Sequence, residues 1–221
     1  MVSTTSVDLA DDAAVPSTKS IRIEWLLRVF ALLAYGFAVR NLAAVWWVDR
    51  SRLTVLLLLL AEGLTLLLVL LARPARHRDA TGFAILLSLY AAFSYVLFDP
   101  RTTTRLIPEI AGVAFQVCGT LWQLTAKVAI GRAFGVLPAL RNVVVSGPYR
   151  VVRHPIYLGY LVVHFGFLLV NFSWRNLIVL SLLYVVQVLR IQREEAILST
   201  NSADYRQYLQ KVRWRLIPFV F

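Results

Sequence analysis

The chain contains very little cysteine and very little charge. Cys118 is its only cysteine in 221 residues, so the chain can form neither an internal disulfide nor a cysteine-based zinc site. Asp, Glu, Lys and Arg make up 16% of the residues, against about 25% in a soluble domain. This composition excludes a disordered protein, and 10 Gly and 8 Pro are too few for a collagen-like chain.

Apolar side chains, gathered in long blocks, fill the chain instead. They make up 59% of the residues, above the roughly 45–50% of a soluble domain, and the mean hydropathy is +0.68. Such a chain has too little polar surface to cover a water-soluble globule. We therefore expect an all-α, polytopic membrane helix bundle with the lipid bilayer as its surroundings.

Six stretches approach the roughly 20 apolar residues that a membrane span needs. The last two are short, so five spans is the alternative. The first 24 residues are polar and lack a basic region leading into an apolar core, which predicts a disordered tail rather than a signal peptide. The spans are expected at roughly 25–48, 53–72, 82–98, 107–128, 155–172 and 175–191.

The net charge of +11 indicates the orientation of the chain. In a membrane protein such an excess favours cationic cytoplasmic loops and anionic headgroups over nucleic acid as a partner. With the N-terminus inside, fourteen Lys and Arg residues lie in cytoplasmic segments and five in outer loops. We expect cytoplasmic termini, a four-span region over 25–128, and a catalytic region over 129–221 that holds two more spans and a cytoplasmic active site, with no metal.

One specific string, GPYRVVRHPIYLG, occupies residues 147–159. Its Gly-Pro pair predicts a turn, and Pro155 suits the first turn of a helix. His154 would then stand where the fifth span begins, with Tyr157 one turn further and two arginines just before. A helix N-terminus among cations attracts a carboxylate or a phosphate. The alternative is a basic membrane anchor with snorkelling arginines.

A second string begins with Arg190 and continues to a Glu pair, a Tyr-x-x-Tyr at 205–208 and an Ile-Pro-Phe at 217–219. Arg190 and Glu194 are one turn apart and share a helix face. Charges at a membrane exit are costly and tend to be functional. The alternative is a helix-end ion pair on a solvated face.

Together the two strings resemble the isoprenylcysteine carboxyl methyltransferase family over about residues 130–221. The resemblance implies a multi-span membrane methyltransferase that uses S-adenosylmethionine. The first four spans match only in being apolar. Two features depart from the family pattern: residues 201–203 lack the glycine expected ahead of the Tyr-x-x-Tyr pair, and residues 131–141 cannot be aligned.

The resemblance also implies roles for individual residues. Glu195 would hold the amino group of the cofactor, and Arg190 would contact the acceptor, with Arg190 and Glu194 as the candidate catalytic residues. The implied cofactor-binding residues are Val143, Val144, Tyr149, His154, Pro155, Ile156, Tyr157 and Glu195.

The implied reaction is methyl transfer to the carboxylate of a lipophilic acceptor, either a small molecule or a lipidated protein. A carboxylate with a pKa near 4 is ionised at neutral pH and needs no base. A phospholipid amine is an alternative acceptor, but it must lose a proton and so needs a base near Tyr149 or Glu194. A nicotinamide-dependent reductase and a non-enzymatic carrier or scaffold are the remaining alternatives.

Two spans carry polar side chains on one face. His164 lies on the face of the fifth span that holds His154 and Tyr157, so it is a candidate acceptor-binding residue. The alternative is a neutral histidine bonded to a neighbouring helix. Polar residues in the fourth span would either line the same chamber or form interhelical hydrogen bonds. They are Gln116, Thr120, Gln123 and Lys127.

Arg40 and Glu62 are charged residues inside the first and second spans. At about 1.5 Å per residue they should lie at similar depths, roughly 12 and 13–14 Å from the outer ends of antiparallel helices. We therefore predict a buried ion pair between them. The competing hypothesis is that Glu62 faces the chamber and takes part in substrate binding.

Overall fold

The computed structural model describes residues 18–71, 81–102, 104–130 and 144–221, and these residues form helices and no strand. This confirms the predicted all-α class. An isolated antiparallel bridge joins Thr104 to Phe172. The helices are α1 (Thr18–Val48), α2 (Leu53–Leu71), α3 (Gly82–Leu97), α4 (Glu109–Ile130), α5 (Pro155–Val170), α6 (Trp174–Asn201) and α7 (Ala203–Lys211).

Two helices extend beyond the predicted spans. α1 begins at Thr18 rather than at 25, so the helix includes part of the predicted tail; residues 1–17 lie outside the described chain. α6 continues ten residues past 191, because residues 192–201 contain neither Gly nor Pro and are rich in good helix formers. It ends where the Ser202 side chain accepts a hydrogen bond from the Tyr205 N–H and begins α7.

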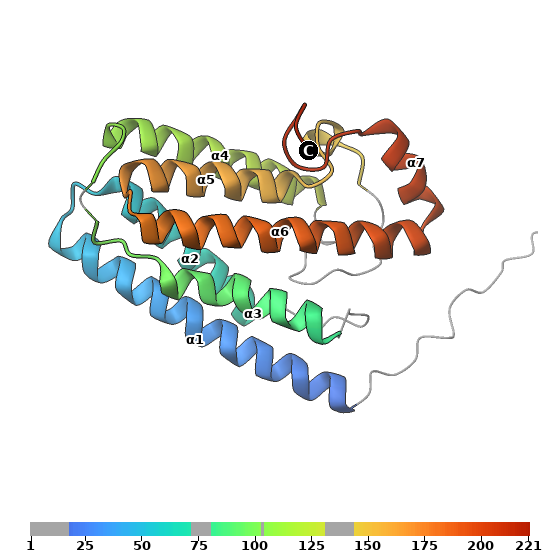
Figure 1. Ribbon diagram of the computed structural model, residues 1–221, viewed down its shortest axis with the longest axis horizontal. Coiled ribbons are helices and arrows are strands. Elements are labelled where there is room, and N and C mark those ends of the chain that lie inside the picture. The colour runs from blue at the N-terminus through green and yellow to red at the C-terminus, as the bar shows by residue number, and fades with distance from the viewer. Residues whose placement is uncertain (1–17, 72–80, 103, 131–143) are drawn as a thin grey trace, which may run out of the picture.

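The first six helices run side by side along the long axis of the molecule, in alternating directions (Figure 1). α4 packs most extensively against α5, α1 against α2 and α3, and α3 against α6. One end, here called the α7 end, holds the start of α1, the 3-10 turn at Gly147–Arg150, α7 and the C-terminal residues. The opposite end, here called the far end, holds the connecting residues 49–52, 98–102, 104–108 and 171–173.

The lengths and compositions of the helices suit a membrane. Two described segments are long and apolar enough to cross a bilayer, Arg28–Val48 and Trp174–Thr200. Three shorter apolar segments accompany them, Leu53–Leu67, Ile85–Leu97 and Pro155–Val170. Large apolar side chains are also exposed along the outside of the bundle. These features fit a helical membrane protein, and the count of six crossings stays a prediction.

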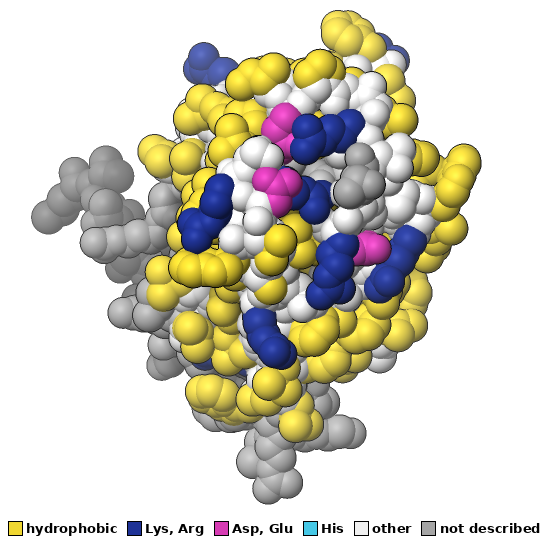
Figure 2. Space-filling model, turned by 90° about the vertical axis from the view of Figure 1, so that its left-hand side faces the viewer, with side chains coloured by type: hydrophobic (Ala, Val, Ile, Leu, Met, Phe, Trp, Pro, Cys, Tyr) yellow, Lys and Arg dark blue, Asp and Glu magenta, His cyan; other side chains and the backbone are white. Residues whose placement is uncertain are grey.

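Charged and polar side chains gather at the far end, where Figure 2 shows basic and acidic groups within an apolar surround. A buried network underlies this surface. Arg52 is buried and donates hydrogen bonds to the carbonyl of Thr102 at 2.7 Å and to Oδ1 of Asn171 at 2.5 Å. Glu109 accepts hydrogen bonds from the N–H and hydroxyl of Thr54 at 2.7 and 2.6 Å. The network joins the starts of α2 and α4 to the α5–α6 connection.

The predicted ion pair between Arg40 and Glu62 is wrong. α1 and α2 are packed neighbours, as expected. Arg40, however, is exposed on the outside of α1, whereas Glu62 is 2% exposed inside the bundle. Among the described residues, the charges that act on Glu62 come from Lys127 rather than from Arg40. This placement favours the competing hypothesis, in which Glu62 faces the interior between the helices.

α4 and α5 pack closely because glycines face each other along their contact. A Cβ atom built on Gly119 would lie 2.8 Å from the carbonyl oxygen of Gly159 and 2.9 Å from the backbone nitrogen of Val163. A Cβ atom on Gly166 would lie 2.8 Å from the carbonyl of Gly112. Small residues allow helix backbones to approach in a membrane, and here they set how deeply α5 sits in the bundle.

We expect Gly119→Ala to destabilise the protein, by about 1–3 kcal/mol, because the added methyl group would meet backbone that cannot move aside cheaply. Gly36→Ala is the matched control, since nothing lies within 4 Å of a Cβ atom there. Thermal unfolding in detergent micelles measures both. Equal melting temperatures for the two variants would contradict the tight contact between α4 and α5.

Candidate active site

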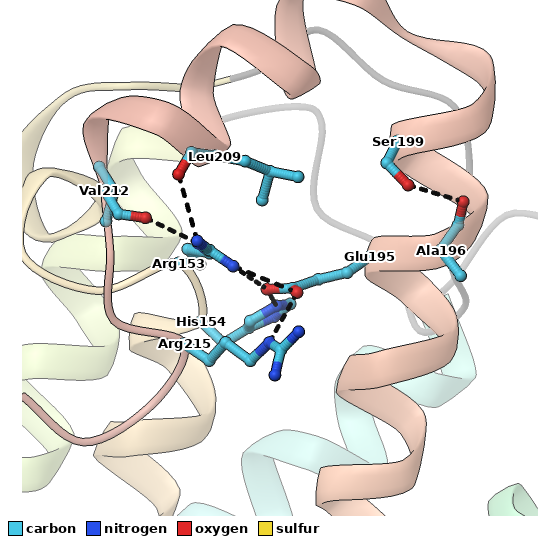
Figure 3. Close-up of polar contacts among 8 residues, drawn as sticks. All are labelled: Arg153, His154, Glu195, Ala196, Ser199, Leu209, Val212 and Arg215. Atoms are coloured by element: carbon cyan, nitrogen blue, oxygen red, sulfur yellow. Dashed lines mark hydrogen bonds and ion pairs between the residues drawn. The ribbon is translucent and has the colours of Figure 1, made fainter. Parts of the chain in front are cut away.

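Three side chains converge on the buried carboxylate of Glu195 at the α7 end (Figure 3). Its Oε1 lies 3.3 Å from Nε2 of His154 and 3.3 Å from Nη1 of Arg153. Its Oε2 lies 2.8 Å from Nε of Arg215 and 3.3 Å from Nη1 of Arg153. Because a carboxylate has about four lone-pair positions, Glu195 has little capacity left for another donor.

The C-terminal segment is bonded along the residues that precede α5. The N–H groups of Arg153 and His154 donate to the carbonyls of Trp214 and Arg215, each at 2.9 Å. The guanidinium of Arg153 also donates to the carbonyl of Val212 at 2.7 Å. The backbone N–H groups of Arg153 and His154 are therefore not available to an anion at the start of α5, because the C-terminal segment already accepts their hydrogen bonds.

Two buried tyrosines, Tyr149 and Tyr208, link the 3-10 turn to α7 beside the Glu195 contacts. Tyr149 lies in the 3-10 turn, and its carbonyl accepts a hydrogen bond of 2.7 Å from the hydroxyl of Tyr208. Burial raises the pKa of the Tyr149 phenol, and the nearby negative charge of Glu194 raises it further. Burial likewise raises the pKa of Tyr208. Both phenols therefore stay protonated at neutral pH and remain hydrogen-bond donors.

Arg190 and Glu194 lie on one face of α6 and are half-buried. Over the described chain they form no ion pair with each other, so the alternative of a helix-end ion pair is not observed. Arg190 makes one long hydrogen bond there, 3.5 Å to Oε1 of Gln187. Glu194 has no hydrogen-bond or ion-pair partner among the described residues. Its negative charge influences the phenols of Tyr149 and Tyr157. In the described chain the site thus holds a cation with one long hydrogen bond, Arg190, and a carboxylate without a bonded partner, Glu194.

His164 lies deeper in the bundle and is 2% exposed. Its Nδ1 lies 2.8 Å from the hydroxyl of Tyr184 on α6, and its Nε2 lies 3.4 Å from the hydroxyl of Tyr95 on α3. This is the arrangement that the alternative hypothesis described, a histidine bonded to neighbouring helices. Its predicted contact with the acceptor stays a prediction.

The polar face of α4 serves two purposes. Gln116 donates a hydrogen bond of 3.1 Å to the carbonyl of Thr54, which is an interhelical bond. Thr120 is exposed and faces away from the interior. Gln123 accepts a hydrogen bond of 3.4 Å from Lys127, whose ammonium group lies 5.5 Å from the centre of the Tyr160 ring. Of these four side chains, Gln116 thus bonds to α2, and Lys127 lies beside an aromatic residue of α5.

The structure brings many of the predicted site residues together and adds two that the sequence did not single out. His154 contacts Glu195, and the His154 and Tyr157 rings lie 5.9 Å apart. Pro155 is buried, Val144 and Ile156 are half-buried, and Val143 lies outside the described residues. The additions are Arg153 and Arg215, the partners of Glu195. Both belong to the motif strings, but nothing in the spacing of those strings predicts that they meet at one carboxylate.

Residues 108–202, which include α4, α5 and α6, match the family model described as phospholipid methyltransferase. No curated protein matches the chain. The family match indicates a membrane methyltransferase. Over the matched residues the chain is similar to the phospholipid methyltransferase family, which is part of the isoprenylcysteine carboxyl methyltransferase-like group of membrane methyltransferases. Enzymes of this family typically use S-adenosylmethionine.

We expect Glu195→Gln to destabilise the α7 end, because it would leave two arginines and His154 without their shared carboxylate. Breaking a buried pair of this kind costs on the order of 3 kcal/mol. Glu194→Gln is the matched control, since Glu194 has no bonded partner among the described residues. Limited proteolysis of the C-terminal segment and the melting temperature measure the difference, and equal behaviour of the two variants would contradict the tethering role.

Proposed function

We propose that this protein is an integral membrane methyltransferase that crosses the bilayer six times, with its α7 end in the cytoplasm. It uses S-adenosylmethionine and methylates a carboxylate on a lipophilic acceptor. The family match, the apolar helices and the cationic α7 end support this proposal. In the bilayer such an acceptor reaches the site from the side, with its polar group at the level of Arg190.

The residues at the α7 end fit the cofactor. S-adenosylmethionine supplies, when bound, a methyl group on a positively charged sulfonium together with an ammonium group. Glu194 is a half-buried carboxylate without a bonded partner in the described chain, so it is suited to pair with that ammonium. Glu195 was the first candidate for this role, but it is bonded to three side chains already. We therefore assign the direct contact to Glu194 and the support of the site to Glu195.

The proposed preference for a carboxylate acceptor depends on Arg190. Its guanidinium is half-buried and has one hydrogen bond of 3.5 Å in the described chain. Its positive charge also influences the nearby phenols of Tyr157 and Tyr160. A planar guanidinium can bind both oxygens of a carboxylate. A carboxylate is ionised at neutral pH and needs no base, so the residues here have to hold and orient the acceptor and exclude water.

A phospholipid amine is the second candidate acceptor. An ammonium group must lose a proton before it can accept a methyl group, and Glu194 is a carboxylate without a bonded partner one turn from Arg190. In that reaction Glu194 would take the proton. The two candidates differ in whether Arg190 or Glu194 is indispensable for turnover.

We expect isothermal titration of the detergent-purified protein to detect binding of S-adenosylmethionine and none of NADPH. Glu194→Gln should weaken cofactor binding at least tenfold, which corresponds to about 1.4 kcal/mol, because it removes the charge that pairs with the ammonium. Arg206→Ala, on the exposed face of α7, is the control and should bind as the wild type does. Binding of NADPH, or an unchanged affinity in folded Glu194→Gln, would contradict this assignment.

We expect Arg190→Ala to keep the cofactor affinity of the wild type and to lose methyl transfer to a lipophilic carboxylate. Arg190→Lys should recover part of the activity, since a point charge cannot replace the planar fork. Arg193→Ala is a matched control from the same turn of α6, where Arg193 bonds to Thr81 instead. Incorporation of labelled methyl groups into S-farnesyl-3-mercaptopropionate and into phosphatidylethanolamine gives the readout. Transfer to the amine alone, lost in Glu194→Gln and kept in Arg190→Ala, would establish the second candidate.

A further inference from the structure

A buried carboxylate in the middle of the bundle has no part in the site described so far. Glu62 is the tenth residue of α2 and is 2% exposed. Its Oε2 atom has no hydrogen-bond partner among the described residues. The charge of Lys127 acts on this carboxyl group, and the hydroxyl of Tyr95 is within hydrogen-bonding reach of it. A carboxylate at this depth is costly, and such residues usually mark a functional position.

Aromatic side chains link Glu62 to the proposed methyl-transfer site. Tyr160 is half-buried, and the charges of both Glu62 and Arg190 act on its phenol. Tyr35 on α1 is likewise acted on by both. At about 1.5 Å per residue, Glu62 lies about 10 Å nearer the far end than Arg190, if α2 and α6 begin at similar depths. Glu62 is thus placed further along the path of an acceptor held by Arg190.

We propose that Glu62 determines acceptor specificity by accepting a hydrogen bond from a donor group on the lipophilic acceptor, such as an amide N–H or an ammonium. This inference rests on the proposed function. It implies that the acceptor carries a second polar group besides the atom that is methylated, so a plain fatty or terpenoid acid would be a poor substrate. Glu62 would then discriminate among acceptors while Arg190 holds the reacting carboxylate.

This inference depends on the Oε2 atom of Glu62, which has no hydrogen-bond partner among the described residues. Buried polar atoms in proteins nearly always have a partner, and an unpaired acceptor lacks a donor that a ligand can supply. The exposed Arg40 cannot supply one. A site that bonds a substrate donor rejects an analogue without it far more strongly than an apolar pocket rejects a missing methylene. Glu62 therefore suits selection between two acceptors of the same length.

Two probes that differ only in a donor group test the proposal. N-acetyl-S-farnesyl-cysteine carries an amide N–H beside its carboxylate, whereas S-farnesyl-3-mercaptopropionate lacks the acetamido group. The kcat/KM of each is measured for the wild type, Glu62→Leu, Glu62→Gln and Gln116→Leu. Gln116 is the matched control, because it is 1% exposed and also has an unpaired side-chain oxygen, but it is bonded to Thr54 near the far end.

We expect the wild type to prefer the amide probe at least tenfold. Glu62→Leu should abolish that preference while leaving the affinity for S-adenosylmethionine unchanged. Glu62→Gln keeps one acceptor oxygen and should retain part of the preference, and Gln116→Leu should retain all of it. A wild type without preference, or a Glu62→Leu protein whose preference stays within twofold of the wild type, would overturn the proposal, as would an equal loss in Gln116→Leu.

Phosphatidylethanolamine separates failure of this inference from failure of the proposed function. If it is the only acceptor methylated, the carboxylate proposal is wrong and the ammonium becomes the donor. The role of Glu62 is then supported by a tenfold lower kcat/KM in Glu62→Leu than in Gln116→Leu, and overturned by equal values. If no acceptor is methylated, titration with N-acetyl-S-farnesyl-cysteine compares the binding affinities of Glu62→Leu and Gln116→Leu. A tenfold weaker affinity in Glu62→Leu supports the role of Glu62, and equal affinities overturn it.

Discussion

The carboxylate of Glu195 ties together three segments that are distant in the sequence, and the arrangement of the α7 end depends on it. Glu195 on α6 binds Arg153 and His154 before α5 and Arg215 near the C-terminus. These contacts fix the rotation of α6 about its own axis. Successive helical residues point about 100° apart, so Glu194 then faces a different side, towards the phenols of the site, together with Arg190 one turn earlier.

The close contact of α4 and α5 determines what the interior of the bundle contains. Because facing glycines let the two backbones approach, α5 lies deep among the other helices, and its polar residues recur on the inner side at helical spacing. His154 contacts Glu195, and His164 contacts Tyr95 and Tyr184. The tether at the α7 end and the polar middle of the bundle are therefore positioned by one helix, and a shift of α5 would disturb both.

The sequence predicted the extents of α2, α3 and α4 well, but it did not predict how the helices are rotated about their axes. An apolar block of given length is a local property, so the spans from residue 53 to 128 agree with the observed helices within a few residues. Counting residues predicts similar depths for Arg40 and Glu62, yet one side chain is exposed and the other is buried, because packing rather than residue count sets rotation about a helix axis. For the same reason the motif strings indicated both glutamates of α6, but only the folded C-terminus distinguishes the bonded one from the other.

The polar groups inside the bundle differ in whether the protein itself satisfies them. His164 has partners on both ring nitrogens, and Asn171 bonds to Arg52 and Thr54. Such groups hold helices together in a medium where an unpaired polar atom is costly. Glu62 differs, because it combines a carboxylate, deep burial and an oxygen without a donor in the described chain. A bundle held together by satisfied polar contacts gains no stability from that oxygen, which makes recognition of a bound molecule the better physical reason for Glu62.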